Sequence, residues 1–416
     1  MDSIINVVLD VDTGVDDAHA LLLALRHPQL NVLAVTTVAG NSDVDTCTRA
    51  TLKVLDAAEA PMDLPVAKGC ATPLVEPTHY CPQIHGTDAL GDLTPPLPTS
   101  TRTIVPEHAV TFLMNLLRQR IATQQPPFTL IALAPLTNIG MLVRLAPDLV
   151  RRGISKIVWM GGACCAGGNA SAWSEANAAY DPEAAHIVLS SCGVPVLMYT
   201  WDVYLKVDFN VAELRSYGCM EAVNDKEAKG EKEEKEEQVH YRAATPPWTQ
   251  LSTRLLLRDM QHFKMSSAQI GDAGAVAAVL CENAAETRHL HVAVELEGKH
   301  TRGMTVCDVR EGVCPPDTPQ KIPNVYVAVG VDAAALKACY ASVVFPSTGT
   351  NTKKEEPQST ATTFTTTAST SPPTTSIGLT TPTTSTSTST STSTTNNNNN
   401  ENNTTRKKCV PSATKC

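Results

Sequence analysis

The chain has 416 residues, of which 42% are apolar and 18% are charged, so it is long enough to bury one large core or two modest ones. Its formal net charge is −9 and its isoelectric point is near 5.7, and no basic stripe of the kind that binds nucleic acid or anionic lipid stands out. No apolar run reaches the roughly 18 residues of a membrane span. We therefore expect neither a nucleic acid nor a membrane as partner, and favour a small neutral or cationic ligand.

Apolar, β-branched segments alternate along the first half of the chain with segments that have a helical repeat. The predicted strands are 4–9, 32–38, 129–133, 156–160 and 195–199. The predicted helices are 18–26, 45–58, 108–120, 137–145 and 182–190. Apolar strands separated by helices form a parallel sheet covered on both faces. The sequence therefore predicts an α/β fold with a mostly parallel, open, doubly wound sheet flanked by helices, and a ligand site beyond the carboxyl ends of its strands.

Two segments interrupt this pattern. Residues 222–245 are rich in Glu and Lys and lack an apolar face, so we expect a solvated, low-complexity insertion. Residues 346–416 consist mainly of Thr, Ser, Pro and Asn, which cannot bury enough apolar surface to offset the entropy of ordering. The sequence thus predicts one large domain over residues 1–345 and a disordered C-terminal tail.

Cellular location is predicted from the first residues and the cysteines. The N-terminus lacks the basic region of a signal peptide and runs directly into the first predicted strand. The 13 cysteines show no C-x-x-C spacing, so we interpret them as reduced, mostly buried thiols. Both features indicate a cytoplasmic protein.

Four carboxylates lie within eight residues at the end of the first predicted strand, in the sequence Asp10-Val-Asp12-Thr-Gly14-Val-Asp16-Asp17. Such a cluster repels itself unless a cation or a shared proton compensates, and hard divalent cations prefer oxygen ligands. Gly14 permits a tight loop at its centre. Asp16 and Asp17 would also suit the N-terminus of the next helix, where acidic residues are favoured. Because Asp10 and Asp12 accompany them, we interpret the cluster as a functional metal site.

Two reactions fit this cluster. In a phosphatase of the haloacid dehalogenase type, Asp10 would be the nucleophile and Asp12 the acid. In an N-glycosyl hydrolase, a carboxylate would take a proton from a metal-bound water that attacks C1 of a sugar. Segments further along the chain distinguish between the two.

The aspartate segment resembles the signature of nucleoside hydrolases of the inosine-uridine preferring type, and five further segments resemble that family in the same order. They are residues 36–41, 85–91, 132–138, 160–185 and 301–303. No phosphatase pattern predicts them. The resemblance covers about residues 3–345 and implies hydrolysis of the N-glycosidic bond of ribonucleosides by a homodimer or homotetramer that uses Ca²⁺.

The resemblance also implies a role for individual residues. It implies that the Ca²⁺ ligands are Asp12, Asp17, the backbone carbonyl of Leu133, and Asp272. Asp16 is then the general base for the Ca²⁺-bound water. The residues expected to contact the substrate are Asn41, His85, Met160, Asn169, Glu175 and Asn177. Hydrogen bonds to ribose hydroxyls would discriminate strongly against deoxyribose, because each missing hydroxyl leaves buried polar groups unpaired.

Three features depart from the family pattern: Ala89 stands where glycine is usual, the loop from Met160 to Asn169 is one residue longer, and Gly271 replaces a histidine. In many members a histidine precedes the late metal-binding aspartate and protonates the departing purine, whereas this chain has Gly271. A general acid typically contributes about a hundredfold to ten-thousandfold. We expect His262, in a helix that resembles the wall of the family's base pocket, to stand in as catalytic donor, with His85 as the second choice. The alternative is a divergent nucleoside-binding relative with weak or no purine hydrolysis.

Overall fold

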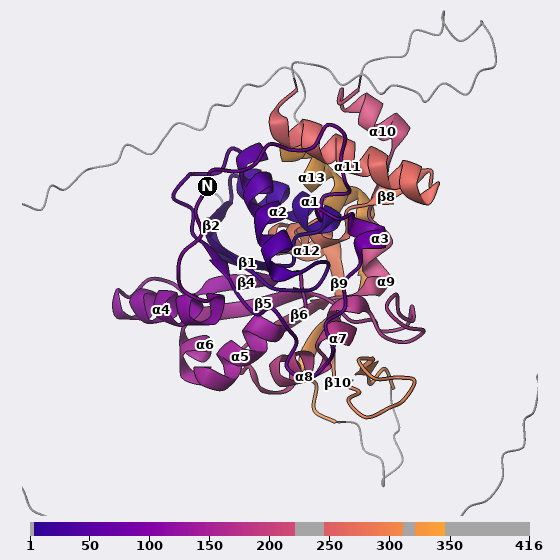
Figure 1. Cartoon of the computed structure of the whole chain (residues 1–416). Helices are drawn as coiled ribbons and strands as arrows, with labels where there is room; N and C mark the ends of the chain where they lie inside the picture. Colours follow the sequence, from indigo (N-terminus) through magenta and orange to yellow (C-terminus); the bar gives the residue numbers. More distant parts are fainter. Residues whose placement is uncertain (1–3, 221–244, 311–320, 346–416) are drawn as a thin grey trace, which may run out of the picture. The chain divides into compact units, whose positions relative to one another are not determined.

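Strand β1 (Ile5–Val11) lies inside an eight-stranded sheet with the order β3-β2-β1-β4-β5-β6-β12-β9 (Figure 1). The computed structural model describes residues 4–220, 245–310 and 321–345, all within one compact unit, Met1–Lys353. Every neighbouring pair from β3 to β12 is parallel, and only β9 pairs antiparallel, with β12. The predicted mostly parallel sheet is therefore confirmed.

The five strands predicted from the sequence all belong to this sheet. Besides β1, its members are β2 (Leu30–Thr37), β3 (Val66–Lys68), β4 (Phe128–Ala132), β5 (Ile154–Met160), β6 (Val196–Tyr199), β9 (Ala285–Leu290) and β12 (Val325–Val331). Two small antiparallel sheets pair β7 (Asp208–Asn210) with β8 (Ser267–Gln269), and β10 (Val292–Val294) with β11 (Thr305–Cys307).

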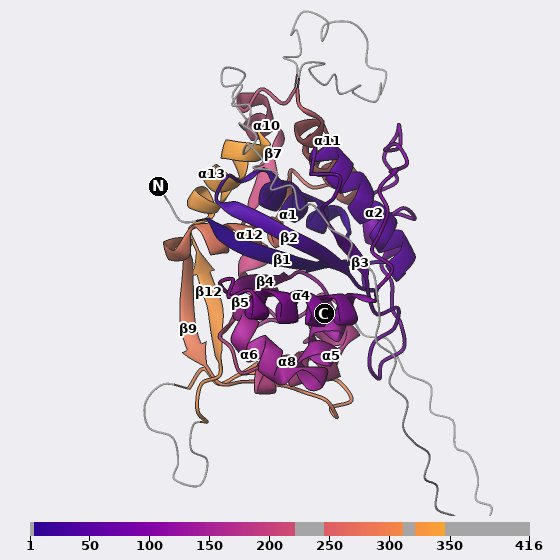
Figure 2. The same ribbon diagram turned by 90° about the vertical axis from the view of Figure 1, so that its left-hand side faces the viewer.

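Helices cover both faces of the large sheet, as Figure 2 shows. One face carries α1 (Val15–Arg26), α2 (Val44–Ala57), α11 (Pro247–Phe263), α12 (Gly271–Leu280) and α13 (Ala333–Val344). The other carries α4 (Ala109–Ala122), α5 (Thr137–Leu145), α6 (Pro147–Gly153) and α8 (Pro182–Ser191). Short helices α3 (Pro82–His85), α7 (Ala176–Tyr180), α9 (Trp201–Tyr204) and α10 (Val211–Ser216) lie in the connections. The arrangement is doubly wound, as predicted.

Side chains of β1 alternate between two cores because successive residues of a strand point to opposite faces. Val7, Leu9 and Val11 pack into the core under α1 and α12, whereas Val8 packs into the core under α4, α5 and α8. Asp10 follows the same alternation as Val8 and bonds to Asn138 of α5. The alternation ends with the strand, so the aspartates that follow β1 lie at its carboxyl end.

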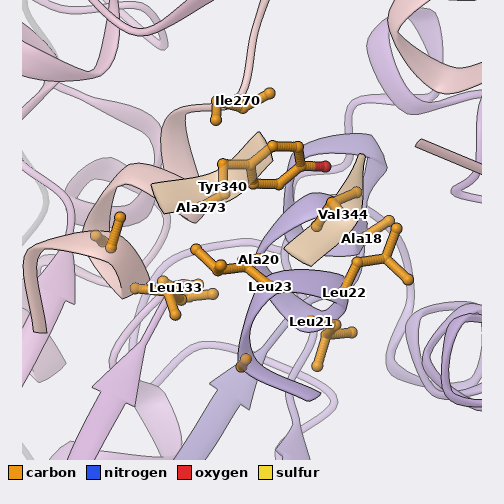
Figure 3. Packing of buried hydrophobic residues seen from close by; sticks show 14 of the residues in the cluster. Ala18, Ala20, Leu21, Leu22, Leu23, Leu133, Ile270, Ala273, Tyr340 and Val344 are labelled. Atoms are coloured by element: carbon orange, nitrogen blue, oxygen red, sulfur yellow. The ribbon is translucent and has the colours of Figure 1, made fainter. Parts of the chain in front are cut away.

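Helix α1 is buried almost completely, which fixes the position of its N-terminus. Leu21, Leu22 and Leu23 are fully buried, and Figure 3 shows them among side chains of α12 and α13 that include Ala273 and Tyr340. Close packing of α1 against α12 brings together the first turns of the two helices, in which Asp16, Asp17 and Asp272 lie. Two acidic helix starts that are far apart in the sequence thereby meet at one edge of the sheet.

A buried histidine on α1 makes the stability of the fold depend on pH. His19 is fully buried and its Nδ1 lies 2.7 Å from the hydroxyl of Tyr340, and burial lowers the pKa of His19 from 6.5 to about 4, against an opposing effect of Asp16. Between pH 6.5 and about 4, His19 is therefore protonated in the unfolded chain but neutral in the folded chain. The stabilising effect of neutral His19 is present above pH 6.5 and is lost as pH falls through that window.

We predict that His19→Gln reduces this pH dependence. Relative to the variant, the wild-type protein should lose about 3 kcal/mol of unfolding free energy between pH 7 and pH 4, since one pKa unit corresponds to about 1.4 kcal/mol. Urea unfolding at both pH values measures the difference. His300→Gln, at an exposed histidine, is the matched control and should leave the pH dependence unchanged. Equal pH dependence in wild type and His19→Gln would show that His19 titrates normally.

Several sequence predictions fall partly or wholly outside the described residues. The tail 346–416 lies outside them, as does the charged insertion 222–245 except for Thr245, so the predicted domain boundaries stay a prediction. The ten cysteines within the described ranges are free thiols. Among these ten, Cys47, Cys70, Cys192 and Cys219 are buried, so the expectation that most cysteines are buried is wrong for the described ones. None of the helices in those ranges combines the length and apolar character needed to cross a bilayer.

Candidate active site

Acidic side chains from three places in the sequence converge at the carboxyl end of β1. One carboxylate oxygen from each of Asp16, Asp17 and Asp272 lies within 4.8 Å of the other two. Asp12 is buried directly after β1. Burial raises the pKa values of Asp12, Asp17 and Asp272, and the charge of Asp16 raises each of the three further. The expected convergence of Asp272 on the N-terminal aspartates is present in the structure.

Asp12, Asp17 and Asp272 each have an Oδ1 that is buried without a hydrogen-bond partner, as is Oδ2 of Asp10 within β1. Burying an unpaired carboxylate oxygen is costly, so each such atom calls for a ligand. Burial, followed by repulsion among the aspartates, holds the pKa of Asp17 and Asp272 well above the usual range. A hard divalent cation would remove both penalties, since it takes oxygen ligands and replaces protons at such sites. The donor set therefore fits a cation such as Ca²⁺.

Asp17 caps the N-terminus of α1 and also has an oxygen available for a metal ion, the two roles that the sequence allowed. Its Oδ2 accepts the backbone N–H of Gly14 at 2.8 Å, which caps α1, and its Oδ1 stays free to face the cluster. Gly14 has a φ of −108°, which any residue adopts, so the loop does not need glycine for its backbone conformation. It is needed because a Cβ there would lie 2.5 Å from His85 Nδ1 and 2.6 Å from Asn41 Nδ2.

Asp16 is the accessible carboxylate of the group. Its side chain is 22% exposed, whereas Asp12, Asp17 and Asp272 are at most 2% exposed. Asp16 Oδ1 accepts the N–H of Asp17 at 3.2 Å, and Oδ2 accepts the hydroxyl of Tyr204 at 3.1 Å. A carboxylate that is open on one side and surrounded by buried carboxylates on the other can take a proton from water.

Of the two histidines expected to act as donors, His85 lies beside Asp16. Its Nδ1 accepts the N–H of Val15 at 3.2 Å and lies 3.8 Å from Asp16 Oδ1, and burial lowers its pKa. We therefore assign a neutral ring with its proton on Nε2. His262 is exposed near the C-terminus of α11, with Nε2 2.9 Å from the carbonyl oxygen of Gln83. Among the described residues, none of the hydrogen bonds of His262 reaches the aspartates.

The residues expected to contact ribose form a second layer beside the aspartates. Asn177 Nδ2 donates to the carbonyl oxygens of Leu133 at 3.2 Å and Met160 at 3.1 Å, at the ends of β4 and β5. Glu175 is buried, its carboxylate accepts three backbone N–H groups, and burial raises its pKa to about 7, with a further contribution from the charge of Asp16. The structure thus brings Leu133, Met160, Glu175 and Asn177 together.

Asn41 and Asn169, which were also expected to contact ribose, lie in different places: Asn41 beside the aspartates and Asn169 at the exposed rim. Asn41 bridges the aspartates, donating its backbone N–H to Asp12 at 2.7 Å and its Nδ2 to Asp17 at 3.1 Å. Asn169 is exposed, and its Oδ1 accepts the N–H of Ala176 at 2.8 Å, which places it at the rim of this layer. Asn41 therefore holds the carboxylates in place, whatever it contributes to substrate binding.

The hairpin segment 301–303, which resembles the family pattern, supports the second layer from outside. Arg302 forms ion pairs with Glu76 and with Glu183, the latter at 2.6 Å. Its carbonyl oxygen accepts the hydroxyl of Ser174 at 2.5 Å, directly before Glu175. The hairpin loop between β10 and β11 thus fixes the turn that presents Glu175.

Asp10 is not available as the nucleophile of a phosphatase. It is fully buried, and one oxygen accepts both the hydroxyl of Thr36 at 2.5 Å and the amide of Asn138 at 2.8 Å. Burial raises its pKa to about 6. Its contacts join β1 to β2 and to α5, so Asp10 stabilises the base of the site and cannot reach a substrate.

Comparison with known proteins finds a matching family model and related sequences. The sequence model of the inosine-uridine preferring nucleoside hydrolase family matches residues 7–338. The chain is 32% identical over 319 residues to the inosine-uridine preferring nucleoside hydrolase of Crithidia fasciculata, covering 73% of this chain and 88% of that protein. It is 32% identical over 307 residues to a pyrimidine-specific ribonucleoside hydrolase of Salmonella arizonae, with the same coverage.

Solved structures give the same result. An inosine-guanosine nucleoside hydrolase superimposes with a TM-score of 0.70 at 27% identity, covering 82% of this chain and 99% of that one. A purine-preferring ribonucleoside hydrolase from Gardnerella vaginalis superimposes with a TM-score of 0.66 at 25% identity, covering 82% of this chain and 98% of that one. With a matching family model, matching relatives and a matching fold, this chain belongs to the inosine-uridine preferring nucleoside hydrolase family.

Proposed function

We propose that this hydrolase of N-glycosyl compounds cleaves the bond between base and ribose of ribonucleosides, with Asp16 as the general base for the attacking water. The observation that carries the proposal is the contrast within the aspartate cluster. Asp12, Asp17 and Asp272 are buried with unpartnered oxygens that suit a cation, while Asp16 alone among them is open to a water molecule.

The proposed Ca²⁺ ligands are Asp12, Asp17, Asp272 and the backbone carbonyl oxygen of Leu133. That carbonyl accepts one hydrogen bond, from Asn177, and a carbonyl oxygen has a second lone pair available. Held by these residues, the cation would lower the pKa of a coordinated water and would help to hold the ribose. Asp16 then accepts the proton of the water, and Asn41, Asn169, Glu175 and Asn177 orient the sugar.

Departure of the base requires a proton donor, and few residues near the site are candidates for this role. His262 remains a predicted donor, but the tautomer of His85 leaves its Nε2–H as a second one, nearer to Asp16. The relatives include pyrimidine-specific and purine-preferring enzymes, so they do not by themselves assign a base to this chain. Gly271 replaces the histidine that protonates a departing purine in many relatives. The alternative proposal is therefore a protein that binds purine nucleosides such as inosine and guanosine but hydrolyses them weakly or not at all.

Release of ribose from uridine, cytidine, inosine and adenosine, with Ca²⁺ and with a chelator, tests the proposal. We expect turnover that stops on chelation and resumes when Ca²⁺ is restored. Nucleoside binding by calorimetry without ribose release from any substrate would support the non-hydrolytic alternative. Turnover that is indifferent to the chelator would contradict the metal site.

Ca²⁺ should also stabilise the folded chain. A ligand that binds only the native state adds about 2.7 kcal/mol at a concentration 100 times its Kd, which corresponds to a rise in Tm of about 4 °C for a domain of this size. The rise should shrink as pH falls, because the raised pKa values of Asp12, Asp17 and Asp272 let protons compete with the cation. Thermal unfolding with Ca²⁺ and with a chelator measures it, and identical Tm values in both would count against a bound cation.

Assembly as a homodimer or homotetramer and location in the cytoplasm stay predictions from the sequence. Sedimentation of the purified full chain distinguishes a dimer or tetramer from a monomer.

A further inference from the structure

Tyr204 and Gly271 are brought together by a short pairing that the main sheet does not require. Antiparallel pairing of β7 with β8 is extended by a bond from Ile270 N–H to the carbonyl oxygen of Val207 at 3.0 Å. The end of α9, where Tyr204 lies, thereby comes to the start of α12, where Gly271 precedes Asp272. This small sheet therefore places a tyrosine at the edge of the aspartate cluster.

The ring of Tyr204 occupies the space that a side chain at position 271 would need. A Cβ built on Gly271 would lie 1.8 Å from both Cδ2 and Cε2 of Tyr204 and 2.3 Å from its Cζ. Real side chains do not approach so closely, and an aromatic ring has no flexible end that could give way. Glycine at 271 and tyrosine at 204 thus fit only as a pair.

The ring is also held from a second direction. Trp201 packs on Tyr204 with ring centroids 4.6 Å apart and an angle of 31° between the planes. The backbone N–H of Trp201 donates to the carbonyl oxygen of Gly162 at 2.9 Å, and Gly162 donates its own N–H to Glu175 at 2.6 Å. The position of the Tyr204 hydroxyl is therefore set by the packing of its ring against Gly271 and Trp201.

That hydroxyl donates to Asp16 Oδ2 at 3.1 Å, while the backbone N–H of Asp17 donates to Asp16 Oδ1 at 3.2 Å. One donor on each oxygen fixes the plane of the carboxylate. Without the phenol, the partly exposed Asp16 side chain would be free to rotate away from the water that it must deprotonate.

We infer that Tyr204 is a positioning residue for Asp16 and that Gly271 is required to make room for it. This inference rests on the proposed role of Asp16 as general base. It assigns a function to the glycine that departs from the family pattern and to a tyrosine that no motif in the sequence marks.

Tyr204→Phe tests the inference, since it keeps the ring and removes only the hydroxyl. We expect kcat for ribose release to fall about tenfold to a hundredfold, the cost of a misplaced catalytic group, with KM, Tm and Ca²⁺ affinity by calorimetry unchanged. Tyr326→Phe, at a tyrosine on β12 that is 42% exposed, is the matched control and should leave kcat unchanged. Wild-type kcat in Tyr204→Phe would overturn the inference.

A double-mutant cycle tests the contribution of Gly271. Gly271→Ala should lower kcat in the wild-type background, because its methyl group displaces the ring. The same substitution should have no further effect in a Tyr204→Ala background, where the ring is absent. Equal losses in both backgrounds would show that Gly271 acts without Tyr204 and overturn the pairing.

Asp16→Asn, measured alongside, separates the two levels of the proposal. An inactive Asp16→Asn together with a fully active Tyr204→Phe would refute the positioning role and leave the proposed function standing. A fully active Asp16→Asn would refute the general base itself, and the positioning role with it.

Discussion

Asp16→Asn should lower kcat for ribonucleoside hydrolysis by about a thousandfold, within the range observed when a general base is removed. The amide cannot accept a proton from water, but it has nearly the same shape as the carboxylate. Its oxygen can still accept the hydroxyl of Tyr204, which lies 3.1 Å away in the wild type. KM and the folded structure should therefore change little, and the loss should be confined to kcat.

Initial rates of ribose release at saturating nucleoside and Ca²⁺ measure this effect. Asp45→Asn is the matched control, because Asp45 is an acidic residue on α2 with a 60% exposed side chain that forms an ion pair with Lys68 at the surface. It should retain wild-type kcat. An Asp16→Asn enzyme within a fewfold of wild type would assign the proton transfer to another group.

Asp272→Asn should weaken Ca²⁺ binding by about a hundredfold or more, since even outer-shell partners of a metal contribute tenfold to a hundredfold. Asp272 is 2% exposed and its Oδ1 has no partner in the described part of the chain. Hydrolysis should fail at Ca²⁺ concentrations that saturate the wild type. Removing one charge from a cluster that repels itself should at the same time raise the Tm of the metal-free protein.

Weaker Ca²⁺ binding together with a higher Tm without metal would identify Asp272 as a metal ligand. Calorimetric titration gives the affinity, and thermal unfolding with Ca²⁺ and with a chelator gives both stabilities. Asp148→Asn on α6, with an 83% exposed side chain, is the control and should change neither affinity nor Tm. A variant that binds Ca²⁺ as tightly as the wild type would place the cation away from α12.

Sequence patterns predicted five of the eight strands of the main sheet, β1, β2, β4, β5 and β6, because these form apolar segments that alternate with helical ones, whereas β3, β9 and β12 were not predicted. The predicted strand 156–160 and helix 137–145 coincide with β5 and α5 to within a few residues. The antiparallel edge strand β9 was not predicted, since its sequence mixes charged and apolar residues and it is largely exposed. Strands β7 and β8 have three residues each, too few for a periodic signal.

In the site, too, the residues marked by a local sequence pattern could be predicted, whereas contacts between distant segments could not. Asp12, Asp16 and Asp17 are marked by their spacing, and the resemblance identified Asp272, which lies with Asp16 and Asp17 in the structure. Their individual roles stay predictions. The phenol of Tyr204 was not predicted, because it reaches Asp16 only through the β7–β8 pairing. Nor was the reason for Gly14 predicted, because it depends on the approach of His85, which lies 71 residues further along the chain.

A crystal structure of the full chain grown with Ca²⁺ and a nucleoside tests the metal site most directly. We predict one ion within about 2.3–2.6 Å of oxygens from Asp12, Asp17 and Asp272, with the ribose diol on the same ion. A water molecule should lie within hydrogen-bond reach of Asp16. An active crystal in which Asp12, Asp17 and Asp272 hold no cation, or in which the nucleoside binds elsewhere, would contradict the proposed mechanism.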